Sequence, residues 1–158
     1  MPVKKLTKKQ ENVVKNIMNH TYARISVSRY GVGTKCIKRI GKGVDPFVIA
    51  QKKCWDNEIS IPWARIKGSK KLKDYITDYY PIDDDGNIFV NENGLNMMNI
   101  SMFMNHSTRP NMVALDTSSC FTKFKTLRAI SVGEELTIDY MDYDFNKEDA
   151  EYIKNYYK

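Results

Sequence analysis

Cysteine and histidine are scarce in this chain, which has three cysteines and two histidines among 158 residues. Cys36, Cys54 and Cys120 lie far apart and form no C-x-x-C pair, so no structural zinc site is expected. We expect three isolated, mostly buried thiols in a reducing compartment, because free cysteine packs as a small hydrophobe. The sequence therefore predicts no metal site.

Long apolar runs are also missing. No stretch approaches the roughly 18 residues that a membrane-spanning helix needs, and the N-terminal sequence MPVKKLTKKQENVV lacks the apolar segment of a secretory signal. We therefore expect an intracellular, soluble protein without a membrane partner. With 42% hydrophobic and 28% charged residues, the chain has the composition of one globular domain with its own core.

Acidic residues are rare in the first third of the chain and concentrated near its end. Residues 1–53 hold thirteen Lys or Arg against Glu11 and Asp45, whereas residues 134–151 hold eight acids against Lys147. A basic block attracts phosphates, which suggests nucleic-acid binding, and an acidic block favours a basic peptide. An ordinary solvated surface explains either block about as well.

Apolar periodicity predicts a few short elements. Residues 5–19 have the pattern of a basic amphipathic helix packed along one edge, and residues 72–79 have helical spacing. Residues 22–27 and 46–50 have strand patterns, and Asp83–Asn87 is a strong turn signal. Short strands separated by turns follow. This pattern predicts a β-rich α+β domain.

Three segments stand out as candidates for chemistry. Residues 31–33 read Gly-Val-Gly, and paired glycines let a backbone approach a ligand because no Cβ intrudes. Residues 105–111 read Asn-His-Ser-Thr-Arg-Pro-Asn, and residues 133–140 read Gly-Glu-Glu-Leu-Thr-Ile-Asp-Tyr. Taken singly, a turn, a structural histidine and a core tyrosine are the commoner explanations.

Together and in this order, the segments resemble the SET domain family of protein-lysine methyltransferases. That family has G-x-G near its start, then N-H-S-x-x-P-N, then G-E-E-L-T-x-x-Y. The resemblance covers roughly residues 22–145 and is closest to the minimal SET domains of some viruses and bacteria. It implies several small β-sheets with a C-terminal pseudoknot. Residues 1–21 would then form a basic N-terminal helical extension, and residues 146–158 an aromatic, acidic helical segment.

The resemblance also implies roles for individual residues. It assigns Tyr140 as the catalytic tyrosine and, by a looser alignment, Tyr75 as a second tyrosine lining a lysine channel. The residues that would hold S-adenosylmethionine are Gly31, Val32, Gly33, Asn105, His106 and Tyr140.

The cysteine-rich segment that closes many SET sites is missing after Tyr140, so another element must cover the cofactor. A homodimer is one way to complete such a site. Aromatic residues are another, although an ordinary hydrophobic seam explains most of them equally well. The candidates are Tyr143, Phe145, Tyr152, Tyr156 and Tyr157.

The resemblance implies methyl transfer from S-adenosylmethionine to a lysine of a protein. A basic segment such as a histone tail is one candidate substrate, and the location would then be a nucleus or host nucleus. A SET-like binding module without catalysis is the first alternative, but such modules usually lose the Asn-His pair or the tyrosine. A nucleic-acid-binding protein is the second alternative, and that activity could coexist with methylation.

Overall fold

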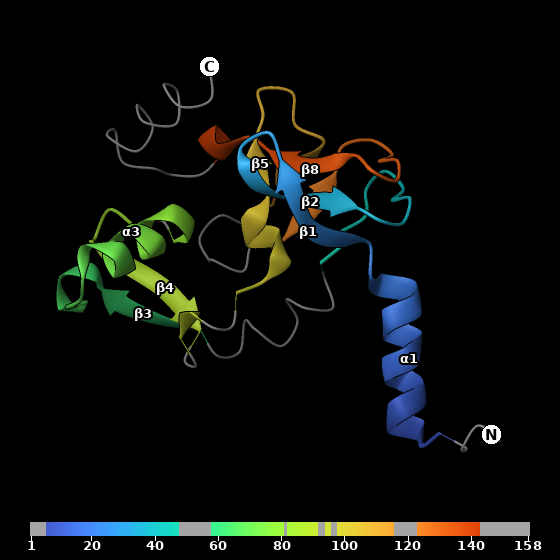
Figure 1. Ribbon diagram of the computed structural model, residues 1–158, viewed down its shortest axis with the longest axis horizontal. Coiled ribbons are helices and arrows are strands. Elements are labelled where there is room, and N and C mark those ends of the chain that lie inside the picture. The colour runs from blue at the N-terminus through green and yellow to red at the C-terminus, as the bar shows by residue number, and fades with distance from the viewer. Residues whose placement is uncertain are drawn as a thin grey trace.

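The computed structural model describes residues 6–47, 58–80, 82–91, 94–95, 98–115 and 123–142, and its strands form three small sheets (Figure 1). The largest has the strand order β1-β2-β8-β5, and the other two pair β3 with β4 and β6 with β7. The first sheet contains β1 Ala23–Ser28, β2 Gly31–Cys36, β8 Glu135–Ile138 and β5 Asn105–His106. The smaller sheets contain β3 Glu58–Pro62, β4 Asn87–Asn91, β6 Met112–Ala114 and β7 Phe124–Thr126.

The described helices are α1 Lys8–His20 and α3 Lys70–Tyr79, with 3-10 turns η2 Trp63–Arg65, η4 Ile100–Phe103 and η5 Tyr140–Asp142. Small sheets with few helices confirm the predicted β-rich α+β class, including its N-terminal helix. No helix within the described ranges is long and apolar enough to cross a bilayer.

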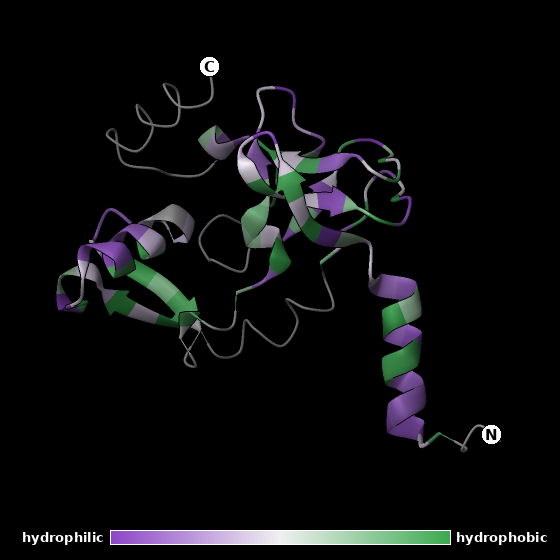
Figure 2. Ribbon diagram, viewed as in Figure 1, coloured by the Kyte–Doolittle hydropathy of each residue, from purple (hydrophilic) through white to green (hydrophobic). Residues whose placement is uncertain are grey.

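Helix α1 begins with a capping box, in which Thr7 accepts from the N–H of Gln10 and the Gln10 side chain accepts from the N–H of Thr7. The helix confirms the prediction for residues 5–19, but the predicted packing of its apolar edge was wrong. None of its residues is buried, and Figure 2 shows green apolar and purple polar bands side by side along it. Periodicity indicates which face is apolar, and it cannot indicate whether a neighbour covers that face.

Helix α3 confirms the helical spacing over residues 72–79. Ser69 caps its N-terminus by accepting from the N–H of Leu72. One face packs on the β3–β4 pair, where Ile76, Tyr80 and Ile88 are buried together.

The β1–β2 hairpin confirms the strand predicted over residues 22–27. Gly31 starts β2 with φ at 101°, a left-handed conformation that favours glycine. The strand predicted over residues 46–50 was wrong where it is described, because Pro46 and Phe47 lie in a turn and residues 48–50 fall outside the described ranges. Asp45 stabilises that turn by accepting from the N–H of Phe47.

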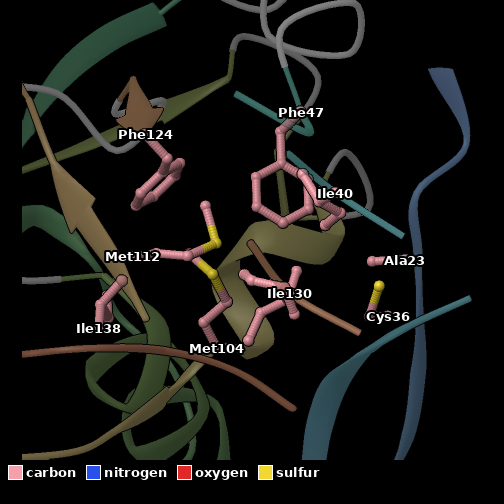
Figure 3. Close-up of a cluster of buried hydrophobic side chains, with 10 residues drawn as sticks. Ala23, Cys36, Ile40, Phe47, Met104, Met112, Phe124, Ile130 and Ile138 are labelled. Atoms are coloured by element: carbon pink, nitrogen blue, oxygen red, sulfur yellow. The ribbon is translucent and has the colours of Figure 1, made fainter. Parts of the chain in front are cut away.

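A core cluster fills the space between the main sheet and the β6–β7 pair (Figure 3). Met104 and Met112 lie at its centre, and the rings of Phe47 and Phe124 meet edge to face with centroids 5.7 Å apart. Cys36 is 2% exposed within this cluster, as expected for an isolated thiol, and burial raises its pKa. Cys54 and Cys120 lie outside the described residues.

Strands β5 and β8 pair in parallel, with Asn105 opposite Thr137 and His106 opposite Ile138. Asn111 holds the loop after β5 against β8, because its Nδ2 donates to the carbonyl of Glu135 and its Oδ1 accepts from the N–H of Thr137. Segments about thirty positions apart in the sequence therefore lie side by side, as the predicted pseudoknot requires.

Candidate active site

Tyr140 lies two residues after the end of β8 and is held at both its backbone and its hydroxyl. Its N–H donates to Nδ1 of His106 over 3.1 Å, and its hydroxyl donates to the carbonyl oxygen of Met104 over 2.7 Å. The rings of His106 and Tyr140 have centroids 5.6 Å apart. The parallel pairing of β5 and β8 thus brings the Asn-His pair and the tyrosine of two separate motifs into one site.

The hydrogen bond from Tyr140 assigns the tautomer of His106. A nitrogen that accepts an N–H carries a lone pair, so Nδ1 is unprotonated and the ring proton of the neutral imidazole lies on Nε2. Asp139 Oδ1 lies 3.4 Å from the same nitrogen and accepts from the N–H of Met141. Asp139 therefore shapes the turn into η5.

The side chain of Asn105 is fixed by three acceptors around its Nδ2. These are Oε1 of Glu135 at 2.6 Å, Oγ of Ser28 at 2.9 Å and the carbonyl oxygen of Val32 at 3.0 Å. A carboxylate and a carbonyl can only accept, so the amide nitrogen must face them. No described residue donates to Oδ1, which is the atom of this side chain that could accept from a ligand.

The two glycines of the Gly-Val-Gly segment have different reasons to lack a side chain. At Gly31 the reason is the positive φ of the backbone, because nothing lies within 4 Å of the position that a Cβ would occupy. At Gly33, that position overlaps Oε1 of Glu135 and lies 2.8 Å from Nδ2 of Asn105. Gly33 therefore makes room for the Asn105 network, whereas the sequence pattern predicted that a ligand would occupy this space.

Glu135 is the residue that sequence reasoning missed at this site, since it was counted as one acid of the C-terminal block. It lies opposite Lys35 in the β2–β8 register, on the face that also carries Gly33. The sequence signal for Glu135 was its position in the Gly-Glu-Glu-Leu-Thr segment, two residues after Gly133. Only the pairing of β2 with β8 shows that it lies beside Asn105.

Tyr75 lies at the end of a row of aromatic rings. Its ring contacts that of Tyr79 with centroids 5.4 Å apart, and Tyr79 contacts Phe103 at 5.2 Å. The Tyr75 hydroxyl donates to Sδ of Met98 over 2.7 Å. Phe103 precedes Met104, whose carbonyl accepts from the Tyr140 hydroxyl. The row of rings therefore extends from α3 toward Tyr140, but Tyr75 itself is not shown in contact with Tyr140.

The proposed aromatic covers and half of the acidic block lie outside the described residues. Tyr143, Phe145 and residues 152–157 are among them, as are Asp144, Glu148 and Asp149. Within the described ranges, no three His, Cys, Asp or Glu side chains gather as a metal site would require.

Comparison with known proteins gives one family. A family model described as SET domain matches residues 4–141. No curated protein matches the chain. Among the solved structures that match is a candidate histone methyltransferase of Plasmodium falciparum, with 15% sequence identity and a TM-score of 0.47. That match covers 76% of this chain and 93% of the other.

Proposed function

The chain belongs to the SET domain family, and from that premise we propose that it is an S-adenosylmethionine-dependent protein-lysine N-methyltransferase. The observation that carries the proposal is the anchoring of Tyr140 to His106 and to the Met104 carbonyl. This anchoring joins the second and third motifs at a single residue. The half-buried tyrosine and the buried Asn-His pair are what a positioned methyl transfer needs.

The residues present fit the cofactor. When bound, it supplies a methyl group on a positively charged sulfonium. Asn105, with its fixed Nδ2 and available Oδ1, is suited to accept from the cofactor's ammonium group. His106 and the backbone of residues 31–33 would complete the binding surface.

The chain's own groups would orient the substrate amine and keep it neutral. Because the Tyr140 proton is donated to Met104, the lone pairs of the tyrosine oxygen can accept from a lysine amine. Burial of the lysine beside a positive charge lowers its pKa and favours the neutral form that attacks. Asp139 is already engaged by the N–H of Met141, so we assign no carboxylate as general base.

The substrate we propose is a lysine within a basic segment, and a histone tail has that chemistry. Asp139 and the exposed Asp142 flank Tyr140 on either side in the sequence. Their charges would attract a basic peptide to the site. A binding module without catalysis is the weaker proposal, because Asn105, His106 and Tyr140 are all kept.

The test is Tyr140→Phe, with Tyr22→Phe as a matched control. Tyr22 is partly buried and its ring contacts Lys38, away from the motifs. Both variants would be incubated with labelled S-adenosylmethionine and with histones or a total lysate. We expect Tyr140→Phe to lose most turnover with nearly unchanged cofactor affinity, since the hydroxyl acts near the transition state.

Two results would contradict the proposal. A wild-type rate in Tyr140→Phe would remove that residue from catalysis. If the wild-type protein binds the cofactor and labels no protein under any condition, the binding-module alternative replaces the enzyme.

A further inference from the structure

Two segments far apart in the sequence form one positively charged edge. Residues 37–44 and 123–130 lie beside each other, and all their cationic side chains are exposed. We call this set the basic edge: Lys38, Arg39, Lys42, Lys123, Lys125 and Arg128.

The backbone beneath the basic edge is fixed by hydrogen bonds and burial. Ile40 and Ile130 exchange two backbone hydrogen bonds and are fully buried. Thr126, at 1% exposure, donates its hydroxyl to the carbonyl of Gly41, and the N–H of Gly43 donates to the Thr126 carbonyl. The cations therefore project from a rigid support, which reduces the entropy lost when they bind.

Acids meet two of these six cations. Arg128 forms an ion pair with Glu134 at 2.7 Å, and the charge of Lys123 acts on the carboxylate of Asp45, which also accepts from two backbone N–H groups. No described acid lies within salt-bridge distance of Arg39, Lys42 or Lys125.

The side chain of Lys125 lies against the other segment of the basic edge, because a Cβ on Gly43 would lie 3.6 Å from Cε of Lys125.

Helix α1 continues the charge beyond the two segments. Lys38 Nζ donates to the carbonyls of Met18 and Asn19, which ties the C-terminal end of α1 to the basic edge. The helix adds Lys8, Lys9 and Lys15 against the single acid Glu11. Figure 1 shows α1 and the two loops at the same end of the molecule, with α3 at the opposite end and the red η5 turn between them.

We propose that the basic edge binds the phosphodiester backbone of a double-stranded nucleic acid without regard to sequence. Duplexes carry a dense row of negative charges that exposed Lys and Arg neutralise. Single-stranded nucleic acid is bound chiefly by stacking on exposed aromatic rings. The one ring on these two segments, Phe124, is buried at 5% exposure. The edge therefore fits a duplex, and it lies away from Tyr140, so the site stays open to a protein substrate.

The test compares two triple variants that lose the same charge. Arg39→Gln, Lys42→Gln, Lys125→Gln removes the edge, and the matched control Lys67→Gln, Lys71→Gln, Lys73→Gln removes exposed lysines at the α3 end. Binding to fluorescent 20-base-pair DNA and RNA duplexes would be measured by anisotropy from 50 to 200 mM salt. Thermal unfolding of both variants would check that each remains folded.

We expect the edge variant to lower the slope of log affinity against log salt by about 2.7, which is three phosphates at about 0.9 each. The control should keep the wild-type slope, and Lys42→Arg with Lys125→Arg should also keep it. If both triple variants lose the same affinity for the duplexes, net charge alone explains the binding and the proposal is overturned. If the wild-type protein binds a poly-glutamate peptide as tightly as it binds the duplexes, the proposal is also overturned, and an acidic protein partner is indicated instead.

Discussion

Replacing Gly33 with alanine tests the Asn105 network most directly. Gly33 does not have positive φ, so alanine adds no backbone strain there. Its Cβ would overlap Oε1 of Glu135 and lie 2.8 Å from both Nδ2 of Asn105 and Cβ of Ser28. These three contacts cannot all be relieved without moving the Asn105 amide away from its acceptors.

The magnitude follows from overpacking and from weakened hydrogen bonds. Overpacking of this kind costs about 1–3 kcal/mol, and for a chain of this length about 1 kcal/mol corresponds to roughly 2–4 °C in Tm. We therefore expect Gly33→Ala to lower Tm by roughly 2–12 °C. Displacement of Asn105 should weaken cofactor binding by at least about tenfold, which is about 1.4 kcal/mol.

Gly41→Ala is the matched control, because a Cβ at Gly41 meets only Cγ2 of Val44 at an ordinary 3.8 Å. Differential scanning calorimetry would give Tm for both variants, and titration with S-adenosylhomocysteine would give the affinity. If Gly33→Ala binds this ligand as tightly as Gly41→Ala does, Asn105 does not hold the cofactor and the reasoning fails.

Three further predictions concern the loop after β5, the turn at Asp45 and the acids beside Tyr140. Asn111→Asp loses the donor to the Glu135 carbonyl, so we expect about 1–3 kcal/mol of destabilisation in urea unfolding, whereas the exposed Asn12→Asp should change stability little. Burial raises the pKa of Asp45 in the folded protein. The stabilisation that comes from the protonated Asp45 is therefore fully present below its pKa in the unfolded chain, about 3.9, and is lost as the pH rises through its pKa in the folded protein. The stability of wild type relative to Asp45→Asn should therefore fall as the pH rises, and a difference that grew with pH would contradict this sign. Asp142→Asn should raise KM for a basic peptide roughly twofold at low salt, since unit charges about 8 Å apart in water interact by about 0.5 kcal/mol. The effect should shrink at high salt, and an unchanged KM at low salt would count against electrostatic attraction.

The local elements could be predicted because their signals are local. The helical spacing around Ile76 and the turn at Asp83–Asn87 each depend on a few neighbouring residues. Gly86 has φ at 76° in that turn, and the N–H of Asn87 donates to Asp83 Oδ1, as the turn chemistry requires.

Long-range pairing could not be predicted from periodicity alone. The motifs indicated that Asn105 and Tyr140 belong together, but the role of Glu135 depends on the register of β2 against β8. The exposure of the apolar edge of α1 was also unpredictable, because it depends on what the rest of the chain places beside the helix. The basic first third was visible as a charge count, whereas the edge needs Lys125 from a segment some eighty positions later.

The position of β8 has a consequence for how the protein is made. It is the last described strand in the sequence, yet it lies inside the sheet between β2 and β5. Until it arrives, β2 and β5 each present an unpaired strand edge of the kind that invites pairing with other chains. Contacts between segments this distant also form slowly. Neither Glu135 nor Tyr140 can take its place before β8 does, so binding of the cofactor would report that a newly synthesised chain has finished folding.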